Sequence, residues 1–346
     1  MKLKLSVLDQ TPIRRGSSAT EALQESLELA KLTDKLGYTR YWLSEHHNIA
    51  TLAGAAPEIL IGRLAGETKQ IRFGSGGIML PNHSTLKVAE NFRLLEALFP
   101  GRIDLGIGRA PGGDRVTASL LNPTNKFHPQ DYVQQIVDLK GFFSNNREEG
   151  TIHEKVMAIP RIDTAPALWM LTSSGESAYI AAHFGMALSF AQFINPQGGR
   201  EAIQQYRMKF VPSLELREPQ TSVGIFVFCG ETEEKAAQVQ AVMDYRLLNL
   251  GRGKVDESPS YEFVKNNSYS REEMAQIQYN RQRMIIGTIE TVKKKLIYLA
   301  NELEVDEIMM STFADKAEDR LKSYELLADA FELSTRAEQV HRAITA

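Results

Sequence analysis

The fold of this chain is best approached from the stretch RYWLSEHHN, residues 40–48. Its first half is apolar and aromatic, which predicts a buried strand. The strand then runs into Glu45, His46 and His47, which packing alone does not require. Polar side chains at the C-terminal end of a parallel strand are typical of the active edge of α/β folds. The triplet is therefore a candidate site, with hydrogen-bonded surface histidines as the alternative.

Strand-like and helix-like segments alternate along the rest of the chain. The predicted strands lie at 3–8, 40–43, 71–75, 103–107, 167–171, 187–190, 222–229 and 305–310. Nearly all are followed by helical spacing of apolar residues, which predicts a parallel sheet with helices outside it. Eight repeats predict a single-domain (β/α)₈ TIM barrel over residues 1–346. An open doubly wound sheet is the alternative, but DQTP at 9–12 lacks the glycine-rich fingerprint that it would need.

The segment 251–283 interrupts this alternation between the seventh and eighth predicted strands. It is polar and aromatic without clear periodicity. Long connections in compact domains are usually functional lids or disordered segments. We interpret it as a mobile, lid-like insertion at the barrel mouth, and a plain solvated insertion explains it equally well.

Composition excludes several classes of protein. The 346 residues are 43% hydrophobic and carry 40 Lys and Arg against 43 Asp and Glu, so no basic surplus favours nucleic acid or a membrane surface. Cys229 is the one cysteine, which excludes an internal disulfide and a cysteine-based zinc site. No histidine or carboxylate spacing indicates a metal site. No apolar leader or membrane-length run is present, so we expect a cytoplasmic protein.

Two groups of residues are candidates for binding a phosphate. Ser173, Ser174 and Gly175 lie between a strand and a helix, where free N–H groups and hydroxyls could bind an anion. An ordinary serine N-cap is the alternative. Arg109 follows the fourth strand in a glycine-rich loop and could clamp a phosphate or a carboxylate. Its alternative is a surface arginine near an aspartate.

Gly76 and Gly77 follow the third predicted strand. Adjacent glycines let a flat ligand pack against bare backbone, although a β-bulge or a tight turn would use them as well. Imidazoles, bare backbone and a phosphate site would then share one edge of the barrel. A cofactor with a phosphate at one end and a planar ring at the other would suit that arrangement.

Three blocks carry a family resemblance: YWLSEHHN at 41–48, GSGGIMLPNHS at 74–84 and PGRIDLGIGRAPG at 100–112. In this order and at barrel spacing, they resemble the luciferase-like monooxygenases, the family of bacterial luciferase and related flavin-dependent oxidoreductases. The resemblance covers almost the whole chain and is closest to a branch of bacterial members. The three blocks together are far more specific than any one alone.

The resemblance implies roles for individual residues. His46 matches the family's catalytic histidine near the flavin ring, with His47 and Glu45 beside it. Gly76 and Gly77 match a pair joined by a non-prolyl cis peptide bond behind the isoalloxazine.

The resemblance also assigns the phosphate contacts to Arg109, Ser173 and Ser174. At other positions this sequence departs from that of bacterial luciferase. Gly108 replaces a reactive cysteine of bacterial luciferase, and Ser173 replaces an acidic residue. The segment 251–283 does not match luciferase well, so light emission is not implied.

The implied activity is that of a two-component monooxygenase acting on paired donors with incorporation of O₂. A separate flavin reductase would supply reduced FMN, and a C4a-peroxyflavin would transfer oxygen to a small, apolar organic substrate. The resemblance also implies a homodimer formed through the helices after the second and third strands. An F420-dependent hydride-transfer oxidoreductase and a flavin-binding protein without turnover are the alternatives.

Overall fold

The computed structural model describes residues 3–110, 112–124, 128–145, 147–252 and 257–334. Within these ranges the strands form one sheet in which neighbours run parallel. They are β1 (Lys4–Asp9), β2 (Arg40–Leu43), β3 (Arg72–Met79), β4 (Ile103–Gly108), β5 (Ala167–Thr172), β6 (Ala187–Ala191), β7 (Thr221–Gly230), β8 (Met284–Thr288) and β9 (Glu307–Ser311).

Eight of these strands close into a barrel in the order β1-β2-β3-β4-β5-β6-β7-β9, with β9 pairing back on β1. This confirms the predicted (β/α)₈ barrel. The additional strand β8 was not predicted. It lies outside the ring and pairs with the second half of β7, from Phe226 with Met284 to Gly230 with Thr288. The first half of β7 pairs with β9, so one long strand belongs both to the ring and to its extension.

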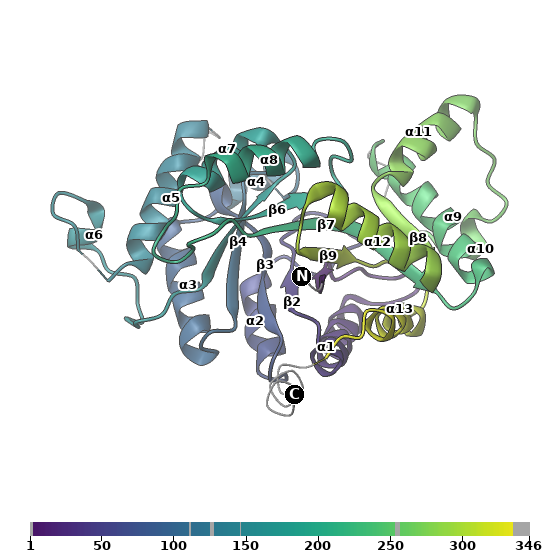
Figure 1. The fold of residues 1–346 in the computed structure, drawn as a ribbon, viewed down its shortest axis with the longest axis horizontal. Coiled ribbons are helices and arrows are strands. Elements are labelled where there is room, and N and C mark those ends of the chain that lie inside the picture. Colours follow the sequence, from purple (N-terminus) through teal and green to yellow (C-terminus); the bar gives the residue numbers. More distant parts are fainter. Residues whose placement is uncertain (1–2, 111, 125–127, 146, 253–256, 335–346) are drawn as a thin grey trace.

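Helices surround the ring (Figure 1). The larger ones are α1 (Ala19–Leu36), α2 (Pro57–Ala65), α3 (Thr85–Leu98), α5 (Pro129–Phe143), α7 (Gly175–His183), α8 (Gly199–Lys209), α9 (Glu233–Leu250), α11 (Arg271–Arg281), α12 (Ile289–Leu303) and α13 (Ala317–Ala330). Shorter ones are η1 (Leu80–Asn82), α4 (Arg115–Leu121), α6 (Ile152–Lys155) and α10 (Tyr261–Val264). Among the described residues, no helix is long and apolar enough to cross a bilayer.

Local sequence explains where helices begin and end. In α1, Ser18 and Glu21 form a capping box, in which each side chain accepts a hydrogen bond from the other's backbone N–H. The helix ends at Gly37, whose φ of 83° is in the left-handed region that glycine tolerates.

The segment 251–283 contains α10 and α11, which pack on α9 at one side of the ring (Figure 1). Its residues 253–256 lie outside the described part of the chain. The hydroxyl of Ser258 donates to the carbonyl of Ile13, and the N–H of Tyr261 donates to Asp315. Because these partners follow β1 and β9, the insertion contacts the C-terminal edge of the barrel. Its mobility as a lid stays a prediction.

The opposite end of the barrel is closed by a buried ion network. The guanidinium of Arg40 donates from Nη1 to Asp104 Oδ2 at 2.9 Å and from Nε to Glu307 Oε1 at 2.7 Å. It also lies over the ring of Trp169, 4.6 Å from the centroid. The interior is further filled by apolar side chains that include Leu8, Trp42 and Met309. A ligand site therefore belongs at the C-terminal ends of the strands.

Candidate functional site

Glu45 organises the edge of the barrel where β2 ends. Its side chain is buried, and Oε1 accepts hydrogen bonds from Nε2 of His47 and Nε2 of His83, each at 2.8 Å. Oε2 accepts from the backbone N–H of Met79 at 2.9 Å. An ionised carboxylate can only accept, so both imidazoles present an N–H to it. One carboxylate thus connects the loop after β2 with the end of β3 and with η1.

These contacts set the protonation of the cluster. Burial would raise the pKa of Glu45, but hydrogen bonds from His83, His47 and the Met79 amide lower it below the usual value. For His83, burial opposes protonation, yet the hydrogen bond and charge of Glu45 outweigh it and raise the pKa. Glu45 is therefore an anion at neutral pH, and His83 keeps its proton to a higher pH than an ordinary histidine.

His46 has a different environment from His47. Its backbone N–H donates to the carbonyl of Gly54 at 3.1 Å. Burial lowers the pKa of its imidazole, while the hydrogen bond to the Gly112 carbonyl and the charge of Glu45 oppose this change. The charges of His47 and, to a smaller extent, Arg246 act in the same direction as burial. A neutral imidazole at pH 7 can either accept or donate a proton. The predicted triplet is therefore divided: the Glu45 carboxylate binds the ring of His47, whereas the ring of His46 is hydrogen-bonded to the Gly112 carbonyl.

The peptide bond between Gly76 and Gly77 is cis. This agrees with what the family resemblance implies. The β-bulge reading also applies, because the register between β3 and β4 shifts between Gly76 and Ile78. A Cβ at Gly76 would lie 2.6 Å from Leu8 Cδ1, and one at Gly77 would lie 2.7 Å from the carbonyl oxygen of Gly106. Close packing therefore restricts both positions to glycine and leaves bare backbone there.

Arg109 reaches the beginning of α7. Its Nη2 lies 2.8 Å from Oε2 of Glu176, in the first turn of that helix. Both side chains are substantially exposed, 36% and 56%, so this ion pair is weak and replaceable. The alternative of a surface arginine also describes this residue, although its carboxylate partner is Glu176 and not an aspartate. A cavity of about 360 Å³ adjoins the pair, lined by Pro81, Arg109, His128, Pro129, Asp131, Tyr132, Gln135 and Glu176.

The loop before α7 leaves its serine hydroxyls available. Ser174 is the N-cap residue, but its side chain makes no capping hydrogen bond. Its backbone N–H instead donates to Thr172 Oγ1 at 3.0 Å, and Asn195 Nδ2 donates to the carbonyl of Ser173 at 2.9 Å. The simple N-cap interpretation is thus not realised. Arg109, Ser174 and Gly175 meet at one helix N-terminus, as an anion site requires.

Sequence reasoning missed two residues of this edge. His83 is not singled out by the sequence, yet it shares a carboxylate oxygen with His47. Arg246, in the middle of α9, was not singled out, although its charge acts on His46. No local motif marks either residue. Among the described residues, no group of three or more His, Cys, Asp or Glu is arranged to hold a metal ion.

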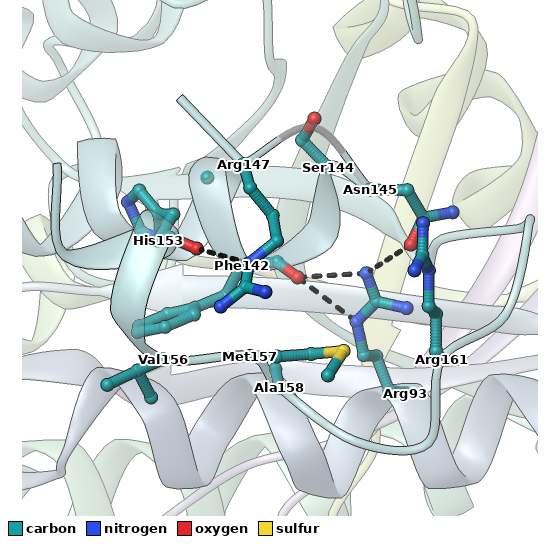
Figure 2. Close-up of a pocket in the computed structure, with 11 residues that line it drawn as sticks. Arg93, Phe142, Ser144, Asn145, Arg147, His153, Val156, Met157, Ala158 and Arg161 are labelled. Atoms are coloured by element: carbon teal, nitrogen blue, oxygen red, sulfur yellow. Dashed lines mark hydrogen bonds between the residues drawn. The ribbon is translucent and has the colours of Figure 1, made fainter. Parts of the chain in front are cut away.

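A small pocket at the other end of the barrel serves packing. There Arg93 of α3 donates to the carbonyl of Phe142 from Nε at 3.1 Å and from Nη2 at 2.9 Å, as Figure 2 shows. The pocket, of about 20 Å³, has room for about one water molecule. Arg93 thus fastens α3 to the C-terminal end of α5.

Replacing Glu45 by Gln tests the carboxylate as the organiser of the cluster. The change keeps the size of the side chain and removes its charge. We expect the pKa of His83 to fall, because burial then acts without an opposing anion. NMR titration of the His83 ring in both proteins measures the shift.

The matched control is Glu58→Gln, since Glu58 also raises the His83 pKa, but through its charge alone. It should give a smaller fall in the His83 pKa than Glu45→Gln.

The pKa of His83 is higher in the folded than in the unfolded protein, so protonation of His83 stabilises the fold. This contribution to the free energy of unfolding is fully present below the unfolded pKa of about 6.5, and it is lost as the pH rises through the folded pKa. An unchanged His83 pKa in Glu45→Gln would show that another group controls this imidazole.

Comparison with known proteins agrees with this geometry. A family model described as luciferase-like monooxygenase matches residues 1–307. The uncharacterised protein YwcH of Bacillus subtilis is 47% identical over 95% of this chain and 99% of its own length. The N-acetyl-S-alkylcysteine monooxygenase of Bacillus subtilis is 34% identical over 95% of this chain and 98% of its own length. The crystal structure of apo-MsnO8 has a TM-score of 0.89, with 37% identity over 96% of this chain and 100% of that one.

More distant structures share the fold alone. The FMN complex of the oxygenating constituent of 3,6-diketocamphane monooxygenase is 18% identical, with a TM-score of 0.69 and coverage of 97% of this chain and 100% of that one. An F420-dependent secondary alcohol dehydrogenase has the same TM-score at 13% identity, and the match covers 96% of this chain and 99% of that one. The family model and the relatives above 30% identity both extend over nearly the whole barrel. The chain belongs to the luciferase-like monooxygenase family.

Proposed function

We propose that this protein is a two-component monooxygenase that uses reduced FMN and O₂ to oxygenate a small organic substrate. The observation that carries the proposal is the meeting of Arg109 with the N-terminus of α7, on the same edge of the barrel as Gly76, Gly77 and His46. The similarity to a monooxygenase that acts on N-acetyl-S-alkylcysteine supports an organic substrate. A separate flavin reductase would supply the reduced cofactor.

The residues present fit FMN. Its phosphate would bind at Arg109 and at the first N–H groups of α7, with hydroxyls from Ser173 and Ser174. The phosphate would replace Glu176 as the partner of Arg109. The flat ring would lie against the bare backbone of Gly76 and Gly77. Bound in its reduced form, FMN supplies the electrons that activate O₂.

The chain's own residues position groups and move protons. His46, with a lowered pKa, is the group that can accept or donate a proton beside the reacting atoms. Glu45 fixes His47 and His83, so these two imidazoles hold the rim in place. The packed interior beneath the site keeps water away from the chemistry.

F420 is the alternative cofactor, because an F420-dependent dehydrogenase shares this fold. It would make the protein a hydride-transfer oxidoreductase. A flavin-binding protein without turnover is a further alternative. The two experiments that follow separate these three functions.

Arg109→Met tests the phosphate site by comparing FMN with riboflavin, which lacks the phosphate. We expect FMN affinity to fall by roughly tenfold to a hundredfold, the equivalent of a charged hydrogen bond, and riboflavin affinity to stay the same. Fluorescence titration measures both. Arg200→Met, which removes an exposed arginine paired with Glu302 on the outer surface, is the control and should bind FMN normally. F420 binding without FMN binding would favour the hydride-transfer function.

His46→Ala separates chemistry from binding. FMN affinity should be nearly unchanged, because the phosphate and ring contacts remain. When the enzyme is given photoreduced FMN in air, we expect hydrogen peroxide to be released roughly a hundredfold faster or more, since loss of a proton-transfer group typically changes rates by at least that factor. Stopped-flow absorbance and a peroxidase assay measure the two quantities. Equal rates in both proteins would remove His46 from the chemistry and favour simple flavin binding.

We propose that the protein forms a homodimer through α2 and α3. These helices pack side by side and expose Ile59, Leu94 and Leu98, which are 70%, 52% and 60% accessible. Apolar side chains gathered on adjacent helices are typical of a subunit interface. Sedimentation velocity should show a dimer, and Leu94→Glu with Leu98→Glu should shift it toward monomer. A monomeric parent protein would contradict the proposal.

A further inference from the structure

Arg246 is a cation on the barrel mouth that the proposed chemistry does not use. It lies in α9, and its guanidinium stacks over the ring of Phe313 with 4.2 Å from Cζ to the centroid. It is half-buried and lines a cavity of about 60 Å³. The cavity walls come from the loops after β1 and β9, from α9 and from the segment before α10: Pro12, Arg14, Arg15, Val242, Ser258, Pro259, Ser260, Phe313, Ala314 and Asp315.

The other arginines of this cavity already have carboxylate partners. Arg14 pairs with Glu25, and Arg15 pairs with Glu257 at 3.2 Å. Each of these two guanidiniums is therefore already paired with a carboxylate of the chain. Neither is available to a ligand without breaking an ion pair.

Asp315, the carboxylate in the cavity wall, does not neutralise Arg246. It accepts the backbone N–H of Tyr261, and the charges that act on it come from Asp319, Lys235 and Arg14. Asp315 is thus part of the insertion's attachment.

Arg246 itself has no carboxylate within salt-bridge distance among the described residues. Burial lowers its pKa to about 10, with no anion acting in the opposite direction. It remains a cation at neutral pH. A partly buried charge without a counter-ion is costly, so the site gains free energy when an anion binds.

The cavity adjoins the chemistry and has an apolar wall. The charge of Arg246 acts on the His46 imidazole, so the two groups are near enough at the mouth to interact electrostatically. From Phe313 a row of aromatic rings continues to Phe226 and then to Phe193, with centroids 5.7 Å and 5.4 Å apart. A volume of about 60 Å³ accommodates a carboxylate and not a whole substrate. The rest of a ligand would have to extend out of the cavity past Phe313, which lines it; Phe226 lies behind Phe313 in a buried apolar cluster.

We propose that Arg246 binds a carboxylate of the organic substrate, whose apolar part packs against Phe313. The inference rests on the proposed function and narrows its substrate from an apolar molecule to an apolar acid. A guanidinium suits this role because its planar fork can donate two parallel hydrogen bonds to one carboxylate. Arg246 is in this sense a residue that determines specificity, while His46 serves the reaction.

The test uses two probes of the same shape, 3-phenylpropanoate and 3-phenylpropanamide, of which only the first is charged. Binding to the full chain without flavin is followed by NMR. We expect the carboxylate to bind about tenfold more tightly or better, as one charged hydrogen bond implies. Arg246→Met should abolish the preference, and Arg246→Lys should keep part of it. Arg200→Met is the matched control and should keep all of it.

A second readout reports the location of the bound acid. 3-Phenylpropanoate should raise the pKa of His46 in the parent protein by neutralising Arg246, and it should have no such effect in Arg246→Met. Equal affinity for the two probes, or a preference that survives in a folded Arg246→Met, overturns the proposal. A carboxylate preference in a protein that binds no FMN would support this site and overturn the proposed monooxygenase.

Discussion

The buried guanidinium of Arg40 imposes the constraint on which the rest of the barrel depends. A charge removed from water must be paired, and here its partners Asp104 and Glu307 come from β4 and β9. One side chain of β2 thereby joins three strands at their N-terminal ends. Arg72 also pairs with Asp104, so two guanidiniums and two carboxylates fill the floor of the barrel without net charge. The filled floor leaves the opposite edge, formed by the loops that follow the strands, as the place for a ligand site.

Glu45 applies the same physics at that opposite edge. Its buried carboxylate is satisfied by two imidazoles and one backbone amide, so hydrogen bonds join the loop after β2 to the end of β3 and to the residue after η1. The histidines that satisfy Glu45 are therefore held by it. The ring of His46 is not bound by Glu45; it is partly desolvated and has the Gly112 carbonyl as its hydrogen-bond partner. His46 and His47 therefore differ because only the ring of His47 binds the buried carboxylate of Glu45.

Periodicity predicted the barrel well because each strand's apolar run is local, and β2 begins and ends as expected at Arg40 and Leu43. It missed β8, whose five residues lie at the end of an aperiodic insertion and pair with a half of β7 more than fifty residues away. The resemblance supplied the cis bond at Gly76 and Gly77, which no spacing rule indicates. The role of His83 depends on a hydrogen bond across 38 residues of sequence. Arg246 stands out only after every other arginine of its cavity has been assigned a carboxylate.

The order of strands around the ring determines how Arg109, Arg246 and His46 are placed relative to one another. Arg109 follows β4 and Phe313, beneath Arg246, follows β9; these two strands are four places apart in a ring of eight and face each other across it. β2, which leads into His46, lies two places from each. On the proposals above, the cofactor phosphate and the substrate carboxylate would bind at opposite sides, with the proton-transferring imidazole between them. The two arginines differ in their partners. Arg109 forms an exposed ion pair with Glu176, which an incoming phosphate can replace. Arg246 is half-buried and has no carboxylate partner among the described residues, so it favours an anion that is part of the substrate.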